Sequence, residues 1–158
     1  MHGLQLLGAH LHAELLRRGQ TLATAESLTG GALADLVSAS PGASETYRGG
    51  VVSYATEVKV AVLGVREETV DEHGVVSAPC AAEMATGVRG VVGSDWALST
   101  TGVAGPTEQE GKPVGTAYVG LAGPDGVETA ELHLDGDRAS IREQVCLRAA
   151  QLLLERLS

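Results

Sequence analysis

The chain contains few aromatic residues and almost no lysine. Among its 158 residues there is no Phe, one Trp and three Tyr, whereas 44% are hydrophobic and 21 are Gly. A core without large rings must be filled by Leu, Val and Ala, so helices and strands are expected to pack closely. The length and composition suit one globular domain over residues 1–158.

The sequence has no excess of basic residues. Eleven Lys and Arg stand against twenty Asp and Glu, which gives a net charge of -9. Proteins that bind nucleic acids usually carry a basic surface, so the composition argues against nucleic acid as a partner. Lys59 and Lys112 are the only lysines. A chain that otherwise uses Arg could need, at those two positions, an ammonium that can lose its proton.

Long apolar runs and cysteine-rich patterns are missing as well. No run reaches the length of a transmembrane helix, and the first residues lack the pattern of a signal peptide, so we predict a cytoplasmic protein that makes no membrane contact. Cys80 and Cys146 are the only cysteines. Two isolated cysteines indicate buried side chains rather than a disulfide framework or a zinc ribbon. The spacing of Gly105 and Gly111-Lys112 does not fit a phosphate-binding P-loop.

Hydrophobic periodicity predicts an alternation of helices and strands. The predicted strands are residues 21–24, 48–54, 95–101, 114–121 and 127–134, and the predicted helices are residues 4–18, 32–37, 56–63, 67–72, 78–90 and 137–157. The last two strands flank Pro124-Asp125-Gly126, which indicates a hairpin. Early alternation followed by a hairpin predicts an α/β fold, a three-layer α/β/α sandwich with a mixed sheet.

Three predicted loops at strand ends carry the polar residues of interest. Ser27-Leu28-Thr29-Gly30-Gly31 joins a strand to a helix. Tyr54 ends the next strand, and Lys59 follows one helical turn later. The third loop is Thr101-Gly102-Val103-Ala104-Gly105-Pro106. Strand ends that lead into helices are where open α/β sheets bind ligands.

Ser27 is a candidate nucleophile, because amides at a helix start could hold the oxyanion that its attack on a carbonyl would create. No histidine lies in the three loops, so Lys59 is the candidate base, and burial would have to lower its pKa. Tyr54 could relay a proton or hold the amine. Each residue also has a purely structural explanation: Ser27 or Thr29 could cap the helix, and Lys59 could be a surface lysine.

Five motifs taken together resemble the CinA C-terminal domain family. They are Ala25–Gly31, the Tyr54-to-Lys59 spacing, Thr101–Pro106, Lys112–Thr116, and Gly136-Asp137-Arg138 with Arg142. The resemblance runs from about residue 5 to residue 156 and implies a single CinA-like domain with an anticodon-binding-domain-like α/β/α fold. The family includes nicotinamide-nucleotide amidohydrolases. The resemblance therefore implies hydrolysis of nicotinamide mononucleotide to nicotinate mononucleotide and ammonia, with no metal and no cofactor.

The resemblance also implies roles for individual residues. Ser27 corresponds to the nucleophile, Lys59 to the base and Tyr54 to an assisting tyrosine. The implied substrate-binding residues are Thr29, Gly30, Gly31, Thr101, Gly102, Ala104, Gly105 and Arg142, the last as the phosphate-binding arginine. Arg138 could act in the same way or could pair with Asp137. Relatives form homo-oligomers, so the resemblance implies a homo-oligomer here.

The chain departs from the family pattern after Pro106, where Thr107-Glu108-Gln109-Glu110 replaces the glycines of many relatives. Carboxylates near an anionic substrate are unfavourable unless they point outward, and Lys112 could be their charge partner instead of a catalytic group. Two other functions remain open. The chain could be a non-catalytic CinA-like interaction domain linked to competence and the DNA damage response, or a serine amidase that acts on another small amide.

Overall fold

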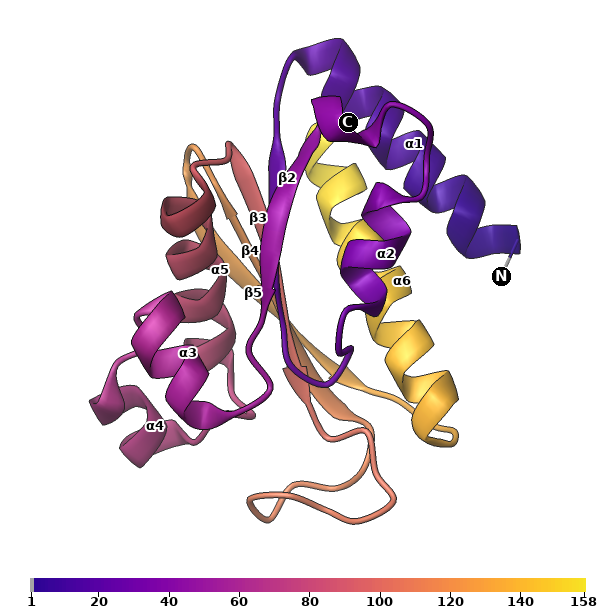
Figure 1. Ribbon diagram of the computed structural model, residues 1–158. Helices are drawn as coiled ribbons and strands as arrows, with labels where there is room; N and C mark the ends of the chain where they lie inside the picture. Colours follow the sequence, from indigo (N-terminus) through magenta and orange to yellow (C-terminus); the bar gives the residue numbers. More distant parts are fainter. Residues whose placement is uncertain (1) are drawn as a thin grey trace.

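A computed structural model describes residues 2–158 of the chain (Figure 1). The strands are β1 (Leu22–Glu26), β2 (Tyr47–Val52), β3 (Trp96–Gly102), β4 (Thr116–Gly123) and β5 (Gly126–His133). The helices are α1 (His2–Arg18), α2 (Ala32–Ser38), α3 (Thr56–Leu63), α4 (Glu67–His73), α5 (Ala78–Val92) and α6 (Arg138–Leu157), with a short 3-10 helix at Ala43–Glu45. Within the described range, every helix is too short or too polar to cross a bilayer.

The five strands form one mixed sheet in the order β2-β1-β3-β4-β5. β1 runs parallel to both β2 and β3, whereas β4 is antiparallel to β3 and β5. All five residues of β1 are buried, as expected for a central strand that is covered on both faces. The carboxyl ends of β1, β2 and β3 therefore meet at one edge of the sheet, and the loops that follow them can share a pocket there.

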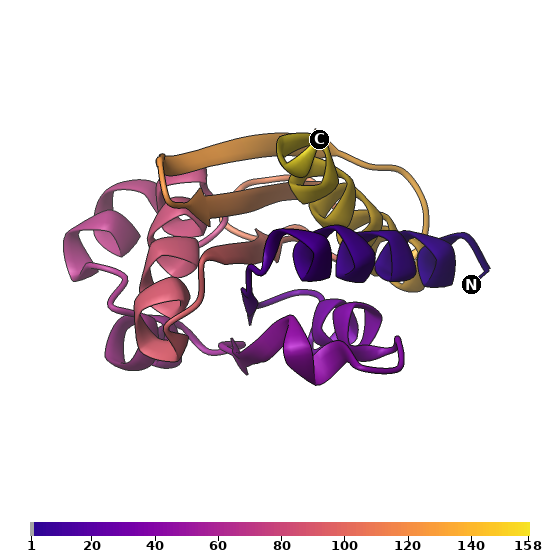
Figure 2. The ribbon, with the colours of Figure 1, turned by 90° about the horizontal axis from the view of Figure 1, so that it is seen from above.

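Helices cover both faces of the sheet. Figure 1 shows α1, α2 and α6 on one side and α3, α4 and α5 on the other, and the view from above in Figure 2 shows the same separation. The core beneath α1, α2 and α6 is rich in leucine, including Leu22, Leu33 and Leu153. The core beneath α5 is built from smaller side chains such as Ala23 and Ala25. The predicted three-layer α/β/α sandwich is confirmed.

The small residues of the second core bring α5 very close to its neighbours. A Cβ atom added at Gly120 of β4 would meet the Ala81 carbonyl oxygen of α5 at 2.4 Å. Ser99 Oγ of β3 donates to that same oxygen at 2.6 Å. A Cβ atom at Gly87 of α5 would meet the Leu63 carbonyl oxygen of α3 at 1.8 Å. Helix α3 therefore rests directly on the backbone of α5, as the lack of large side chains predicts.

Several predicted strand boundaries differ from the structure by one or two residues, and two of these differences bear on the loops around the site. β4 begins at Thr116 instead of residue 114. Gly115 has a φ of 94°, and a Cβ atom there would meet the Leu134 carbonyl oxygen at 1.9 Å, so this residue turns the chain where extended structure was expected. β2 ends at Val52, which leaves Tyr54 in the connection to α3. The β4–β5 hairpin and the burial of both cysteines are confirmed.

Candidate active site

Ser27 lies at the carboxyl edge of the sheet, directly after β1. Its backbone N–H donates to the Thr100 carbonyl of β3 at 3.0 Å, and the preceding carbonyl, that of Glu26, accepts from the Ser53 N–H at 2.7 Å. Ser27 is thus held from both neighbouring strands. The predicted position of Ser27, on the turn between a strand and a helix, is confirmed.

Lys59 projects from α3 toward Ser27 and is buried, with 1% of its surface exposed. Its Nζ atom lies 3.0 Å from Ser27 Oγ, 2.7 Å from the Ser53 carbonyl oxygen and 3.3 Å from the Tyr54 carbonyl oxygen. Burial lowers the pKa of the Lys59 amine below that of an ordinary lysine, and the nearby Cys80 and Glu110 raise it by smaller amounts. The surface-lysine alternative is therefore wrong.

The two carbonyl groups determine which way a neutral Lys59 amine faces. An ammonium has three hydrogens to donate, whereas a neutral amine has two hydrogens and one lone pair. If the carbonyls of Ser53 and Tyr54 take the two hydrogens, the lone pair is directed at Ser27 Oγ. This geometry is what a base that deprotonates Ser27 requires.

The start of α2 is capped by Glu26, and neither Ser27 nor Thr29 caps it. The N-cap residue, Gly31, has a φ of 106° and no side-chain cap of its own. Glu26 Oε1 accepts from Thr29 Oγ1 at 2.6 Å and from the Leu33 N–H at 2.8 Å. At the start of α2 the Leu33 and Ala34 amides are bound to this carboxylate and the Ala32 amide to the Thr29 carbonyl, so none of the three is left to receive a substrate oxyanion.

One backbone amide next to Ser27 remains a candidate oxyanion donor. The Gly30 N–H donates to the Ser27 carbonyl at 3.0 Å. The Thr29 N–H has no acceptor among the described residues, but Thr29 does not line the pocket that contains Ser27. In the part of the chain that the structure describes, the Leu28 N–H has no acceptor, and Leu28 lines the same pocket as Ser27. Across the trans peptide this N–H points opposite to the Ser27 carbonyl, away from Gly30. We therefore assign Leu28 N–H as the candidate oxyanion donor.

The pocket at this edge has a volume of about 330 Å³. Of the predicted substrate-binding residues, four line it, namely Thr101, Gly102, Ala104 and Gly105. The three residues Thr29, Gly30 and Gly31 lie outside its lining. Two basic side chains line it, those of Lys59 and Arg138, together with the acidic Glu108.

Tyr54 and Arg138 join two of the pocket loops. Arg138 donates through one nitrogen to Tyr54 Oη at 2.8 Å and through another to the Gly105 carbonyl at 2.7 Å. The Tyr54 side chain is 58% exposed, and the described contact between Tyr54 and Lys59 is made by the Tyr54 carbonyl. Arg138 does not pair with Asp137, whose carboxylate instead caps α6 through the Ser140 N–H. The assisting role of Tyr54 stays a prediction.

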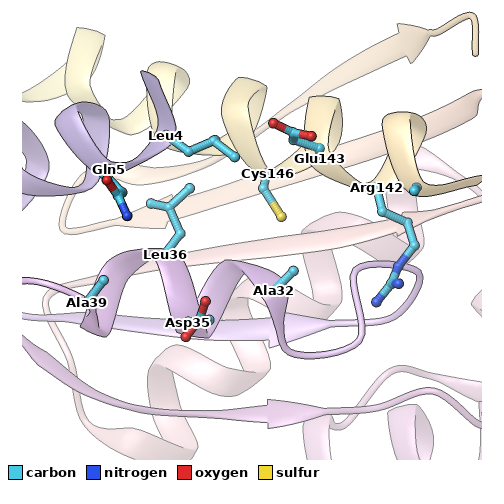
Figure 3. A pocket seen from close by; sticks show the side chains of 10 residues that line it. Leu4, Gln5, Ala32, Asp35, Leu36, Ala39, Arg142, Glu143 and Cys146 are labelled. Atoms are coloured by element: carbon cyan, nitrogen blue, oxygen red, sulfur yellow. The ribbon is translucent and has the colours of Figure 1, made fainter. Parts of the chain in front are cut away.

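Arg142 lies on the other side of the Ser27 turn. Its Nε donates to the Leu28 carbonyl at 2.8 Å, and its second nitrogen donates to the Thr29 carbonyl at 2.9 Å. Figure 3 shows its side chain reaching from α6 toward the turn before α2, at the end of a separate pocket lined by α1, α2 and α6. A direct contact between Arg142 and the substrate phosphate stays a prediction that this position does not support.

The segment 107–110, which departs from the family pattern, is hydrogen-bonded to two residues that line the pocket, Val75 and Val76. The carboxylate of Glu110 accepts from the N–H groups of Val75 and Val76 at 3.0 and 2.9 Å. Lys112 donates to the Val76 carbonyl and lies 5.9 Å from the ring centre of Tyr118. Lys112 therefore pairs with a carbonyl group and not with the carboxylates for which it could have been the charge partner.

Comparison with known proteins identifies relatives over nearly the whole chain. The model of the CinA C-terminal domain matches residues 5–157. A CinA-like protein of Frankia casuarinae is 52% identical over 144 residues, which cover 91% of this chain and 33% of that protein. A putative competence-damage inducible protein of Caldanaerobacter subterraneus is 49% identical over 140 residues, or 88% of this chain and 34% of that one. The chain thus spans about a third of the length of these relatives.

Solved structures agree with this relationship. A CinA superfamily protein from Klebsiella pneumoniae has a TM-score of 0.95 and 36% identity, and the match covers 98% of this chain and 97% of that one. A competence or damage-inducible protein from Enterobacter asburiae has a TM-score of 0.96 and 31% identity, with 98% of both chains covered. The chain belongs to the CinA C-terminal domain family.

Proposed function

We propose that the chain is an amidohydrolase that converts nicotinamide mononucleotide to nicotinate mononucleotide and ammonia. The observation that carries this proposal is the buried Lys59 amine 3.0 Å from Ser27 Oγ. A serine paired with a lysine of lowered pKa is suited to acyl transfer from an amide. The nucleotide substrate is the one that the family resemblance implies.

In the first step, Ser27 Oγ attacks the carboxamide carbon while neutral Lys59 takes the hydroxyl proton. Negative charge develops on the amide oxygen, and the Leu28 N–H donates a hydrogen bond to it. Protonated Lys59 then gives its proton to the departing nitrogen, so that ammonia leaves and an ester between Ser27 and the nicotinoyl group remains.

In the second step, water hydrolyses the ester. Lys59, neutral again, accepts a proton from the attacking water, and the collapse of the second tetrahedral intermediate returns a proton to Ser27 Oγ. The products are a carboxylate and ammonia, which takes up the proton of the acid to form ammonium, so the overall reaction consumes one water molecule. Every proton transfer uses the same amine.

The substrate specificity of the proposed enzyme can be tested with a panel of related amides. We expect ammonia release from the mononucleotide at a kcat/KM at least tenfold above those for nicotinamide and nicotinamide riboside, which lack the phosphate and so lose its binding energy. The dinucleotide is the fourth amide of the panel. A coupled ammonia assay on purified protein measures all four. Preference for an unrelated small amide would instead support a different serine amidase, and no ammonia from any amide would refute the amidohydrolase.

Arg138 is the proposed phosphate contact. Of the two basic residues that line the pocket, Lys59 acts as the base, which leaves the Arg138 guanidinium to bind an anion. We expect Arg138→Met to raise the KM for the mononucleotide about tenfold to hundredfold, the loss expected for a hydrogen bond to a charged group. The KM for the riboside, which has no phosphate, should change little. Arg148→Met, on an exposed position of the same helix, is the matched control. Equal changes for both substrates would place the phosphate elsewhere.

A further inference from the structure

Glu26 stands immediately before Ser27 and is buried, with 1% of its surface exposed. Within residues 2–158, no Lys, Arg or His forms a salt bridge with its carboxylate. Instead, the carboxylate accepts four hydrogen bonds, from Thr29 Oγ1 at 2.6 Å and from the N–H groups of Gly31, Leu33 and Ala34 at 3.2, 2.8 and 3.0 Å. A buried carboxylate without a cation is costly, and these donors offset its loss of hydration.

This cap differs from the side-chain caps of α5 and α6. Helix α5 is capped by Ser77 and α6 by Asp137, and in both cases the capping residue directly precedes the helix. The cap of α2 comes from the preceding strand, so the hydrogen bonds of Glu26 close residues 26–34 into a loop that contains Ser27. Stabilisation of α2 alone would not require the capping residue to adjoin the candidate nucleophile.

The turn is held from its other side by Arg142, which binds the carbonyls of Leu28 and Thr29 (Figure 3). Between the two anchors, the Gly30 N–H closes the turn onto the Ser27 carbonyl at 3.0 Å. The Glu26 carboxylate thus accepts hydrogen bonds from N–H and O–H groups that follow Ser27, and the Arg142 guanidinium donates to carbonyl groups of the same turn. Together they fix the direction of the Leu28 N–H relative to Ser27 Oγ.

We propose that Glu26 is a positioning residue that aligns Ser27 Oγ and the Leu28 N–H for attack on the substrate. This inference rests on the proposed function where it is tested by turnover. A second test, the rate at which a reagent labels Ser27, requires only that Ser27 is reactive. A displacement of about 1 Å at the reacting atoms can cost about a hundredfold in rate. Loosening the turn should therefore lower turnover much more than substrate binding.

The test is Glu26→Gln. Glutamine keeps the size and one acceptor oxygen, but its amide hydrogens face groups that are themselves donors. We expect kcat for the mononucleotide to fall about a hundredfold while KM stays within about threefold of the parent value, because the Thr101–Gly105 wall and Arg138 do not contact Glu26. The rate at which a small sulfonyl fluoride labels Ser27, followed by peptide mass spectrometry, should fall in parallel.

Asp95→Asn is the matched control. The Asp95 carboxylate also accepts from a backbone N–H and a threonine hydroxyl, those of Thr21 at 2.8 and 3.1 Å, but at the opposite end of the sheet. This variant should lose stability while its kcat and its Ser27 labelling rate remain at parent values. A purely structural role for Glu26 predicts the same behaviour for Glu26→Gln.

Parent-like kcat and labelling rate in folded Glu26→Gln overturn the positioning role. If Glu26→Gln does not fold, Thr29→Val decides, because it removes only the 2.6 Å bond to Glu26 Oε1 and the contact with Thr100. We expect about tenfold slower labelling for it, and an unchanged rate overturns the proposal. If the parent labels at Ser27 but releases no ammonia, only the proposed function fails. If the parent does not label at Ser27, both proposals fail.

Discussion

Replacing Ser27 by alanine should lower the turnover of nicotinamide mononucleotide by at least about a thousandfold, since the covalent path then has no nucleophile. The pocket wall would be unaffected, so the dissociation constant of the substrate should stay within a few-fold of the parent value. Ammonia release under single-turnover conditions and isothermal titration calorimetry measure the two quantities. A rapid quench of the parent protein should also capture the acyl ester on Ser27, which the variant cannot form.

Ser38→Ala is the control for this experiment. Ser38 is exposed on α2, and its hydroxyl donates to the Ala34 carbonyl within the same helix. Its removal should leave kcat at the parent level. Ammonia release by Ser27→Ala at the parent rate would show that another residue, or water directly, attacks the amide.

Replacing Lys59 by methionine should lower kcat/KM by about a hundredfold to ten-thousandfold, the usual contribution of a general base. Methionine matches much of the length of the lysine stem and suits the buried site, although the carbonyls of Ser53 and Tyr54 lose their donor. Circular dichroism and the thermal midpoint check that the variant is folded. Full activity in a folded variant would contradict the assignment of the base.

The pH dependence of kcat/KM provides an independent test of the same amine. The base acts only when neutral, so the rate should rise with pH through the pKa of Lys59 and level off above it. Because burial lowers this pKa, the rise should lie below 10.5, the pKa of an ordinary lysine. The rising limb should disappear in Lys59→Met and persist in Lys112→Met, which removes the only other lysine. A limb that persists in Lys59→Met would belong to another group.

The sequence predicted the fold and the main pair of side chains because both depend on local patterns. Strand and helix periodicity placed Ser27 after a strand, and Lys59 one turn into a helix after the next strand. Because β1 runs parallel to β2 and β3, the loops that follow these strands lie at the same edge of the sheet. By contrast, the sequence pattern could not show that Lys59 is buried, because burial depends on how α3 packs against α5 and the sheet.

The hydrogen-bond partners of Glu26 and Arg138 could not be predicted in the same way. The only sequence signal for Glu26 was a glutamate at the end of the otherwise uncharged strand Leu22-Ala23-Thr24-Ala25, and nothing local indicated that its side chain would turn back to cap α2. Arg138 reaches Tyr54 across 84 positions of sequence. Such long-range hydrogen bonds are set by the packing of α6 on the sheet, which a single sequence does not encode in any short motif.

The contact between Gly87 and α3 has a consequence for the proposed proton path. Since a Cβ atom at position 87 would come within 1.8 Å of the Leu63 carbonyl, any larger residue there would push α3 outward and carry Lys59 with it. The distance between the Lys59 amine and the Ser27 hydroxyl therefore depends on the absence of a side chain at Gly87. This glycine lies in α5, a helix that contributes no reacting group.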